Sequence, residues 1–401
     1  MEIANVQDVL HFAEEYNVKF IRLQFTDALG ILKNIAITVK DLPRALQEGM
    51  IFNSSTASRL GIPAKSIRLT PDPKTFVIFP WRPREGAVAR LLCNIDIPDF
   101  GRDYDICPRI NLKMAAGLPT LSEISATCAF YLFNEGANLN LHGPNRTEVH
   151  DQAGFCDLSP VDLGENVRRD VVLTLEEMGI QADYSRHAAG PGQHEIAFKC
   201  DDLLTLADNL VTFKFVVRTI AQRHGLRASF MPQPLADLPG SGLTLKVEME
   251  EDRAQKLAAN LAKRLKSVLL FTNPLVNSYK RLLRMPMEES IQVPSANTWE
   301  LAFPDLAANP YLALAAITVA ATWETSASEP DEPRPIHELI SAQELPKDLG
   351  EALQAAKSCL WLHESMEDGL LDWVFSQKEA EWNRFQSVVH CWEVKEYFAN
   401  Y

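Results

Sequence analysis

The sequence predicts a two-domain protein of the α+β class. A chain of 401 residues is longer than one ordinary hydrophobic core supports, so two domains are expected. Strand-like and helix-like segments follow one another without the regular alternation that a parallel βαβ sheet requires. Pro98, Gly101, Pro108 and the polar residues between them are typical of a linker. We therefore predict domains at residues 1–104 and 105–401.

The first predicted domain combines one helix with several strands. Residues 5–16 place apolar side chains at helical spacing, and residues 18–25 have the composition of a strand. Two further β-rich runs cover residues 75–81 and 89–97. Together these elements predict a small α+β domain.

The second predicted domain mixes strands with longer helices. Residues 129–133 and 194–198 are strand-like in composition. Amphipathic or strongly helical patterns are found at residues 166–178, 210–224 and 253–270. Asn166 lies close to the position of a helix N-cap. Residues 351–401 are mostly helical in pattern. No repeat of one supersecondary unit connects these segments, which favours α+β over α/β.

Charge and hydropathy exclude several functional classes. Lys and Arg number 39 against 53 Asp and Glu, a formal charge of −14, whereas nucleic-acid binding requires a basic surface. The longest apolar stretch, residues 310–323, is shorter than the ~20 residues that span a bilayer. The first residues lack a basic segment before an apolar one, and the seven cysteines are scattered without a C-x-x-C pair. We predict a cytoplasmic protein with reduced thiols.

General site motifs are uninformative. The chain has no P-loop, no nucleophile elbow and no H-E-x-x-H motif. Gly240 and Gly242 belong to a Gly-rich turn, which alone does not indicate a phosphate site. His187 and His194 bracket a Gly-Pro-Gly loop and are too far apart for a helical metal pair. These residues taken alone support only a two-domain α+β protein.

Several segments, read in order, are similar to glutamine synthetase of the bacterial type I class. The resemblance extends over essentially the whole chain, and its main segments are residues 21–30, 75–81, 154–179, 190–199, 212–235, 272–283, 307–317 and 381–401. It implies a small N-terminal β-grasp domain and a larger C-terminal domain. The larger domain has an antiparallel sheet, flanked by helices, that forms a funnel-shaped site. It also implies a homo-oligomer, a hexameric ring or a dodecamer.

The resemblance implies a reaction in which ATP phosphorylates glutamate and ammonia then displaces the phosphate. Hard cations such as Mg²⁺ or Mn²⁺ assist phosphoryl transfer and require oxygen ligands. Other residues stand where the resemblance places most of these ligands: Thr127, Ala129, Ala188 and Thr244. Only Glu195 and Glu300 keep a carboxylate. We therefore expect at most weak binding of Mg²⁺ or Mn²⁺ and of ATP.

Other parts of the implied machinery are altered as well. Thr298 and Ala302 replace two arginines, and residues 283–290 are too short to carry the family's arginine and its glutamate flap. The segment Asn53-Ser54-Ser55-Thr56 replaces an acidic loop near the ammonium site. Loss of one charge-stabilising group typically costs ~10²–10⁵ in rate, so these changes predict a crippled enzyme.

A few residues match the family's substrate-binding positions. Arg281 matches an arginine that contacts the glutamate carboxylate, and Gly240 and Gly242 keep the Gly-rich turn. We predict these three as remnants of a substrate site, with Glu195 and Glu300 as remnants of a metal site. We assign no catalytic residue.

The leading prediction is a glutamine synthetase homologue that has lost ligation. It would act through assembly, through regulation of an active paralogue or through ligand sensing in nitrogen metabolism. One alternative is an ATP-dependent γ-glutamyl–amine or ammonia ligase of altered specificity. Another is a module that binds glutamate, glutamine or a nucleotide without catalysis. Expected partners are further copies of the chain or an active glutamine synthetase, with no nucleic acid and no membrane.

Overall fold

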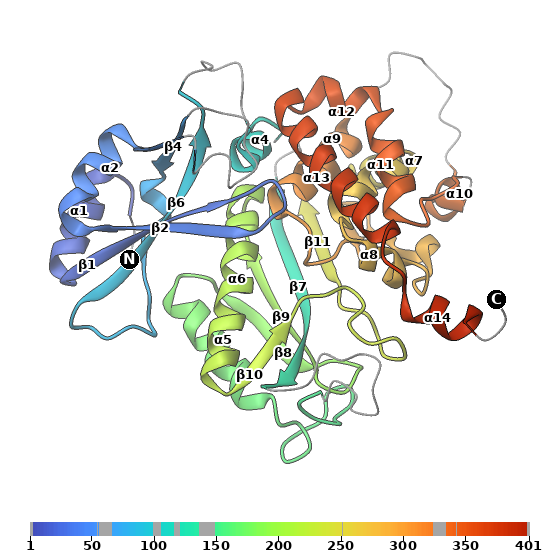
Figure 1. The fold of residues 1–401 in the computed structure, drawn as a ribbon, viewed down its shortest axis with the longest axis horizontal. Coiled ribbons are helices and arrows are strands. Elements are labelled where there is room, and N and C mark those ends of the chain that lie inside the picture. Colours follow the sequence, from blue (N-terminus) through green and yellow to red (C-terminus); the bar gives the residue numbers. More distant parts are fainter. Residues whose placement is uncertain are drawn as a thin grey trace.

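A computed structural model describes residues 3–53, 55, 66–98, 106–115, 121–135, 149–250, 252–323, 334–341 and 343–398. It contains two β-sheets, one in each half of the chain, and most helices surround the second sheet (Figure 1). The α+β class is therefore confirmed. The predicted boundary near residue 104 lies outside the described residues.

The N-terminal sheet has the order β2-β1-β6-β4-β3, and β5 pairs with β6. Its strands are β1 (Val18–Thr26), β2 (Leu32–Thr38), β3 (Met50–Asn53), β4 (Ser66–Pro71), β5 (Val77–Ile78) and β6 (Ala87–Asp96). β1 runs parallel to β6, and the other pairs are antiparallel. The expected strand at 75–81 shrinks to two residues, because Pro73 starts a 3₁₀ turn and Pro80 lacks an N–H donor for the sheet.

Two helices accompany this sheet, α1 (Val6–Glu15) and α2 (Leu42–Glu48). α1 begins with a capping box, in which the Asn5 side chain accepts from the Asp8 backbone and the Asp8 carboxylate accepts from the Asn5 backbone. Val9 and Ala13 of α1 are buried against the sheet. The predicted first helix is confirmed.

The C-terminal sheet has the order β12-β13-β11-β7-β9-β8, with β10 paired to β7, and all of its pairs are antiparallel. Its strands are β7 (Leu121–Asn134), β8 (Ala182–His187), β9 (Gln193–Cys200), β10 (Leu226–Ser229), β11 (Leu243–Met249), β12 (Ile291–Ser295) and β13 (Thr298–Leu301). β7 and β9 are longer than the strands predicted there, and their pairing runs from Ile124 to Tyr131 through the polar residues Ser125 and Thr127.

The two faces of the C-terminal sheet differ in chemistry. On β7 alternate residues from Ile124 through Phe130 to Leu132 are almost fully buried. This face packs on α6 (Leu203–Arg223), where the ring of Phe213 lies 6.0 Å from that of Phe130. Ser125 and Thr127 point to the opposite face, which remains open. The sheet therefore has one face in the core and one available for a site.

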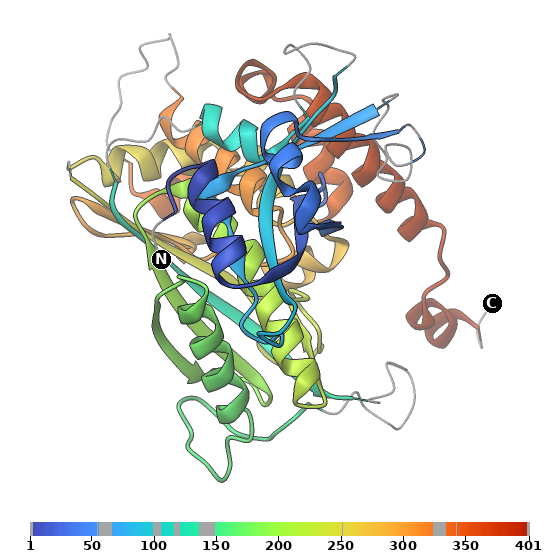
Figure 2. The same ribbon diagram turned by 90° about the vertical axis from the view of Figure 1, so that its left-hand side faces the viewer.

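The helices of the C-terminal half lie against one side of the sheet and beyond one of its ends (Figure 2). They are α4 (Pro108–Ala115), α5 (Glu165–Glu177), α6, α7 (Ala254–Thr272), α8 (Val276–Leu282), α9 (Pro310–Thr322), α10 (Ile336–Ser341), α11 (Leu349–Lys357), α12 (Leu360–Ser365) and α13 (Asp368–Gln386). α6 begins seven residues earlier than predicted, at Leu203, because the Asp202 side chain caps it by accepting from Thr205 N. α5 has Gly164 and not Asn166 at its N-cap, without a side-chain cap.

The apolar stretch at 310–323 forms a core helix. α9 is buried along its whole length, from Pro310 to Ala321, and contacts α7, α4 and α6. Asn309 caps it by accepting from Tyr311 N, and Pro310 occupies the first turn. Among the described residues, no helix has the length and apolar character to cross a membrane.

The two halves are joined by a buried polar network around Arg109 of α4. Its Nε donates to Asp208 of α6 at 3.0 Å, and its Nη2 lies 2.8 Å from both Asp208 and Asp72. The Tyr311 hydroxyl donates to Asp208 at 2.7 Å, and Arg109 Nη1 donates to Asn94 at 3.1 Å. This network fixes the N-terminal sheet against the helices of the larger half.

Candidate active site

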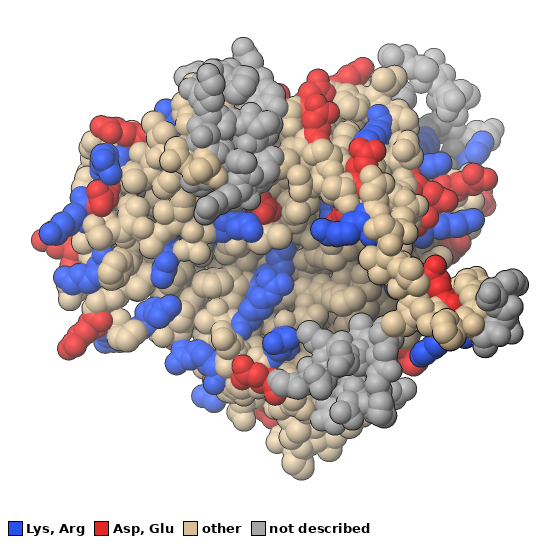
Figure 3. All heavy atoms as spheres, viewed as in Figure 1, with Lys and Arg blue, Asp and Glu red and all other residues tan. Residues whose placement is uncertain are grey.

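The open face of the C-terminal sheet carries a cavity of about 430 Å³. Figure 3 shows this side of the molecule hollowed near its centre, with Lys and Arg side chains beside the hollow. The cavity is lined by Thr127, Ala129, Glu195, Gln233, Leu238, Pro239, Gly240, Gly242, Thr244, Arg281, Arg284, Met285, Pro286 and Ala302. It therefore brings together most of the sequence-predicted site residues: Gly240, Gly242, Arg281 and Glu195.

Arg281 is held rigidly against the Gly-rich turn. Its Nη1 donates to Phe303 O and its Nη2 to Ala302 O, both at 2.8 Å. A Cβ on Gly242 would lie 2.3 Å from Arg281 Nη2, and one on Gly240 would lie 2.8 Å from Arg281 Cγ. These two glycines are required for space and not for an unusual backbone conformation. Burial lowers the pKa of Arg281, and the charge of Asp305 partly opposes this.

Glu195 of β9 is paired with Arg186 of β8, its cross-strand neighbour. Arg186 Nε lies 2.7 Å and Nη2 2.6 Å from the same oxygen, Oε2. The guanidinium also lies over two rings, 4.8 Å from the centroid of Phe155 and 5.1 Å from that of Tyr184. Desolvation opposes the charge of Arg186, but the hydrogen bond and charge of Glu195 raise its pKa.

Glu300 lies away from Glu195 on the same face. Glu300 of β13 pairs with Lys246 of β11, which in turn pairs with Ser125 of β7. Glu195 instead pairs with Ala129, four residues further along β7. The two carboxylates therefore occupy different rows of the sheet with two strands between them, and the register does not make them neighbours.

The donor set does not fit a resident divalent cation. Hard cations require several oxygen ligands, and carboxylates are the strongest of these in proteins. Thr127, Ala129 and Thr244 line the cavity without a carboxylate, and Glu195 already contacts a guanidinium. Within the described part of the chain, no group of three His, Cys, Asp or Glu residues that could hold a metal includes Glu195 or Glu300.

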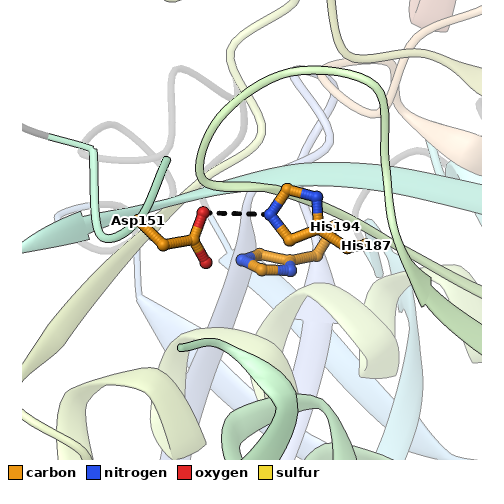
Figure 4. Close-up of side chains that lie close together, drawn as sticks. All are labelled: Asp151, His187 and His194. Carbon is orange, nitrogen blue, oxygen red and sulfur yellow. Dashed lines mark hydrogen bonds and ion pairs between the residues drawn. The ribbon is translucent and has the colours of Figure 1, made fainter. Parts of the chain in front are cut away.

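A second polar cluster lies buried behind the site (Figure 4). His187 and His194 are cross-strand neighbours in the β8–β9 hairpin, and their ring centroids are 4.8 Å apart. His187 Nε2 lies 3.0 Å from Asp151 Oδ1, and His187 Nδ1 lies 2.9 Å from Ala188 O. The spacing rule that separated the two histidines applies to helices, whereas a hairpin brings them together.

This histidine cluster has the chemistry of a structural network. Arg168 Nη1 lies 2.9 Å from His194 Nδ1 and must be the donor there, so the proton of the neutral ring is on Nε2. That nitrogen then has no lone pair for a metal. Desolvation, followed by the charges of Arg168 and His187, holds the pKa of His194 well below its usual range. The hydrogen bond from His187 lowers the pKa of Asp151 against the effect of burial.

Arg186, which contacts the cavity residue Glu195, is a candidate that the sequence reasoning missed. The Gly-Pro-Gly turn indicates a hairpin, but its register, which pairs residue 186 with residue 195, is set by the fold. Of the altered loop at 53–56, Ser54 and Thr56 lie outside the described residues. In the shortened segment 283–290, Met285 and Pro286 line the cavity.

Comparison with known proteins identifies the fold. The chain matches the family model "Glutamine synthetase, catalytic domain" over residues 106–397 and the model "Glutamine synthetase, beta-Grasp domain" over residues 17–98. A structure titled "Apo GmaS without ligand" is similar with a TM-score of 0.81 at 26% identity, covering 98% of this chain and 99% of that one. A Plasmodium falciparum glutamine synthetase has a TM-score of 0.80 at 17% identity, covering 99% of each chain, and shows the fold alone. The predicted β-grasp and larger sheet domain are confirmed.

Curated relatives decide against the leading functional prediction. A glutamine synthetase from Clostridium saccharobutylicum is 38% identical over 444 aligned residues, covering 98% of this chain and 99% of that protein. One from Staphylococcus aureus strain Mu50 is 35% identical, covering 98% of each. Likeness to synthetases over the full length overturns the prediction that ligation has been lost, and it favours the alternative of a ligase. This chain belongs to the glutamine synthetase family.

Proposed function

We propose that this protein is an ATP-dependent ligase that joins ammonia or a small amine to the γ-carboxyl group of glutamate. The observation that carries the proposal is the full-length likeness to glutamine synthetases at up to 38% identity. The open cavity that contains Arg281 and Glu195 supports it. ATP would enter as its magnesium complex, so that the metal arrives with the substrate.

The proposed reaction has two steps. ATP transfers its γ-phosphoryl group to the γ-carboxylate, releasing ADP, and the nitrogen nucleophile then displaces phosphate from the acyl phosphate. Arg281 would attract the glutamate carboxylate. The carbonyls of Ala302 and Phe303 hold its guanidinium in place before substrate arrives, which reduces the ordering cost at binding.

The cavity favours an amine as the nucleophile. Leu238, Met285 and Pro286 give part of its wall an apolar surface suited to an alkyl group. An ammonium ion needs acidic groups, but Glu195 is paired with Arg186 and the segment 53–56 contains no carboxylate. A protonated alkylamine has the same requirement, so the preference for an amine rests on the apolar wall of the cavity.

The test is product formation from ATP, glutamate and either ammonia or a panel of alkylamines, followed by mass spectrometry. We expect a γ-glutamyl product with ADP release, and faster turnover with an amine. Arg281→Ala should abolish it, whereas Arg169→Ala, at an exposed position on α5, should not. Absence of a γ-glutamyl product with every nucleophile would contradict the proposal.

We also propose that the chain forms a homo-oligomer through its C-terminal tail. α14 (Cys391–Tyr397) projects from the body of the molecule (Figures 1 and 2), and 63% of Trp392 and 85% of Phe398 are exposed. Such an apolar tail requires a covering surface. A hexameric ring or a dodecamer would provide it. Native mass spectrometry should show an assembly that a chain ending at Ser387 loses. A monomeric full-length protein would refute this. A role in nitrogen metabolism and a cytoplasmic location remain predictions.

A further inference from the structure

Among the described residues, the cavity lacks the carboxylates that a metal ion requires, but a positively charged side chain lies beside it. Positive charge is needed where phosphate or carboxylate oxygens gather, and metal ions commonly supply it. Here the cavity offers no cluster of carboxylates for a metal, but a guanidinium lies directly beside its one described carboxylate, Glu195. The positive charge beside Glu195 is therefore supplied by a side chain of the protein, Arg186.

We propose that Arg186 is a built-in cation that takes the place of a divalent ion beside Glu195. Through its remaining Nη1 edge it would bind an anionic oxygen of a substrate, either a phosphate of ATP or a carboxylate of glutamate. This inference rests on the proposed ligase function, because that function supplies the anionic substrates.

The hydrogen bonds of Arg186 leave one edge for a ligand. Nε donates to Oε2 of Glu195, and Nη2 lies 2.6 Å from the same oxygen. No hydrogen bond of Nη1 to another described residue is found, and 37% of the Arg186 side chain is exposed. A guanidinium carries five N–H donors in a planar fork, so it can bind Glu195 on one edge and an oxyanion on another.

The surroundings hold this guanidinium in place. Phe155 and Tyr184 provide ring faces on which it lies. The Tyr184 hydroxyl is 3.0 Å from the Thr127 hydroxyl, which links the aromatic support to the wall of the cavity. A cation that is positioned before the ligand arrives costs less to order at binding.

Two lysines on this face are already paired with carboxylates. Lys199 contacts Glu123 at 3.0 Å, and Lys246 contacts Glu248. Both lysines lie next to Ser125 in the sheet, four residues along β7 from Ala129, which is the neighbour of Glu195. Arg186 differs because its partner Glu195 itself lines the cavity.

The experiment measures binding of inorganic phosphate and of L-glutamate by calorimetry, each with EDTA and with Mg²⁺. In EDTA we expect Arg186→Ala to weaken binding of one of the two anions by about 10- to 100-fold, the range of charge-assisted hydrogen bonds. Arg186→Lys should keep part of the affinity, and the surface variant Arg169→Ala all of it. The anion that is affected identifies the source.

Metal dependence gives a second readout. Wild-type binding should change less than about twofold when Mg²⁺ is added, because the site carries its own cation. In Arg186→Ala, Mg²⁺ should restore part of the lost affinity by bridging Glu195 and the anion. The double variant Arg186→Ala/Glu195→Gln should lose that rescue. Added guanidinium should also rescue Arg186→Ala.

Two results would overturn the inference. One is unchanged affinity for both anions in folded Arg186→Ala. The other is wild-type binding that requires Mg²⁺ to the same extent as Arg186→Ala. Failure of the ligase proposal is distinguishable, because it would show as absence of a γ-glutamyl product in the wild-type protein whatever the anion affinities.

Discussion

Two arginine–carboxylate pairs in this molecule have contrasting surroundings. Arg109 and Asp208 join the two halves of the chain, with 6% and 12% of their side chains exposed. Glu195 lines the cavity and Arg186 is paired with it, with 20% and 37% of their side chains exposed. Arg109 uses Nε, Nη1 and Nη2 on partners within the protein, whereas Arg186 uses Nε and Nη2 on Glu195 alone.

The contrast shows how one chemical pair serves two purposes. A buried pair with all of its partners fixed stabilises one arrangement of the two halves, and breaking it leaves a charge without solvent. A partly exposed pair contributes little to stability, but its arginine keeps N–H donors that a ligand can reach. The predictions below test this difference, from the largest expected effect to the smallest.

Arg109→Ala should destabilise the protein most. It leaves Asp208 buried at the junction without its cation, and Asp72 with only Lys113 at 3.9 Å, at a cost of about 3–5 kcal/mol. Chemical denaturation should show this loss in the free energy of unfolding. A change below about 1 kcal/mol would mean that the junction tolerates separation of the charges.

Gly242→Ala should damage the cavity. The added Cβ would lie 2.3 Å from Arg281 Nη2, so the guanidinium must leave the carbonyls of Ala302 and Phe303. We expect a loss of about 1–3 kcal/mol in stability and a higher KM for glutamate. Gly154→Ala is the control, since its nearest contact would be an ordinary 3.5 Å. An unchanged KM would show that the position of Arg281 is not critical.

Stability should fall as pH drops below about 6.5, the usual pKa of histidine. The pKa of His194 is lowered in the folded protein, mainly by desolvation, so the unfolded chain binds the proton first. The contribution of His194 is fully present above the unfolded pKa and is lost at about 1.4 kcal/mol per pH unit below it. His194→Gln should flatten this slope between pH 6.5 and 5. An identical slope in the variant would assign the effect elsewhere.

Arg186→Ala should have the smallest effect on stability, at most about 1 kcal/mol, because its pair with Glu195 is accessible to solvent. The measurement is the denaturation experiment used for Arg109→Ala. A loss as large as that of Arg109→Ala would make both pairs structural, and the contrast between them would disappear.

Much of the fold could be predicted from local patterns. The helix at 5–16 and the strand at 18–25 have periodicities that match their burial, and each agrees with α1 or β1 to within a residue. The predicted helix ends were wrong where a capping side chain sets the first residue, as Asp202 does for α6. The predicted strand at 75–81 is only two residues long in the structure, because Pro80 has no N–H to donate to the sheet.

The functional prediction failed for a different reason. Thr127 and Ala129 stand where the resemblance places metal ligands, and their presence suggests a loss of chemistry. Aligned positions show which metal-binding carboxylates are missing. They do not show which side chain of a neighbouring strand lies where the metal would be. Arg186 is on β8, and only the hairpin register places it on Glu195.

The sequence by itself determined the family, the α+β class and the apolar core, because each depends on short segments or on their order along the chain. It also predicted Arg281, Gly240 and Gly242, which line one cavity in the structure. Only the tertiary structure decided which polar groups meet: Arg186 with Glu195, Arg109 with Asp208, and His187 with His194. Electrostatic interactions depend on distance and burial, and both are set by strand register and helix packing across residues that are far apart in sequence.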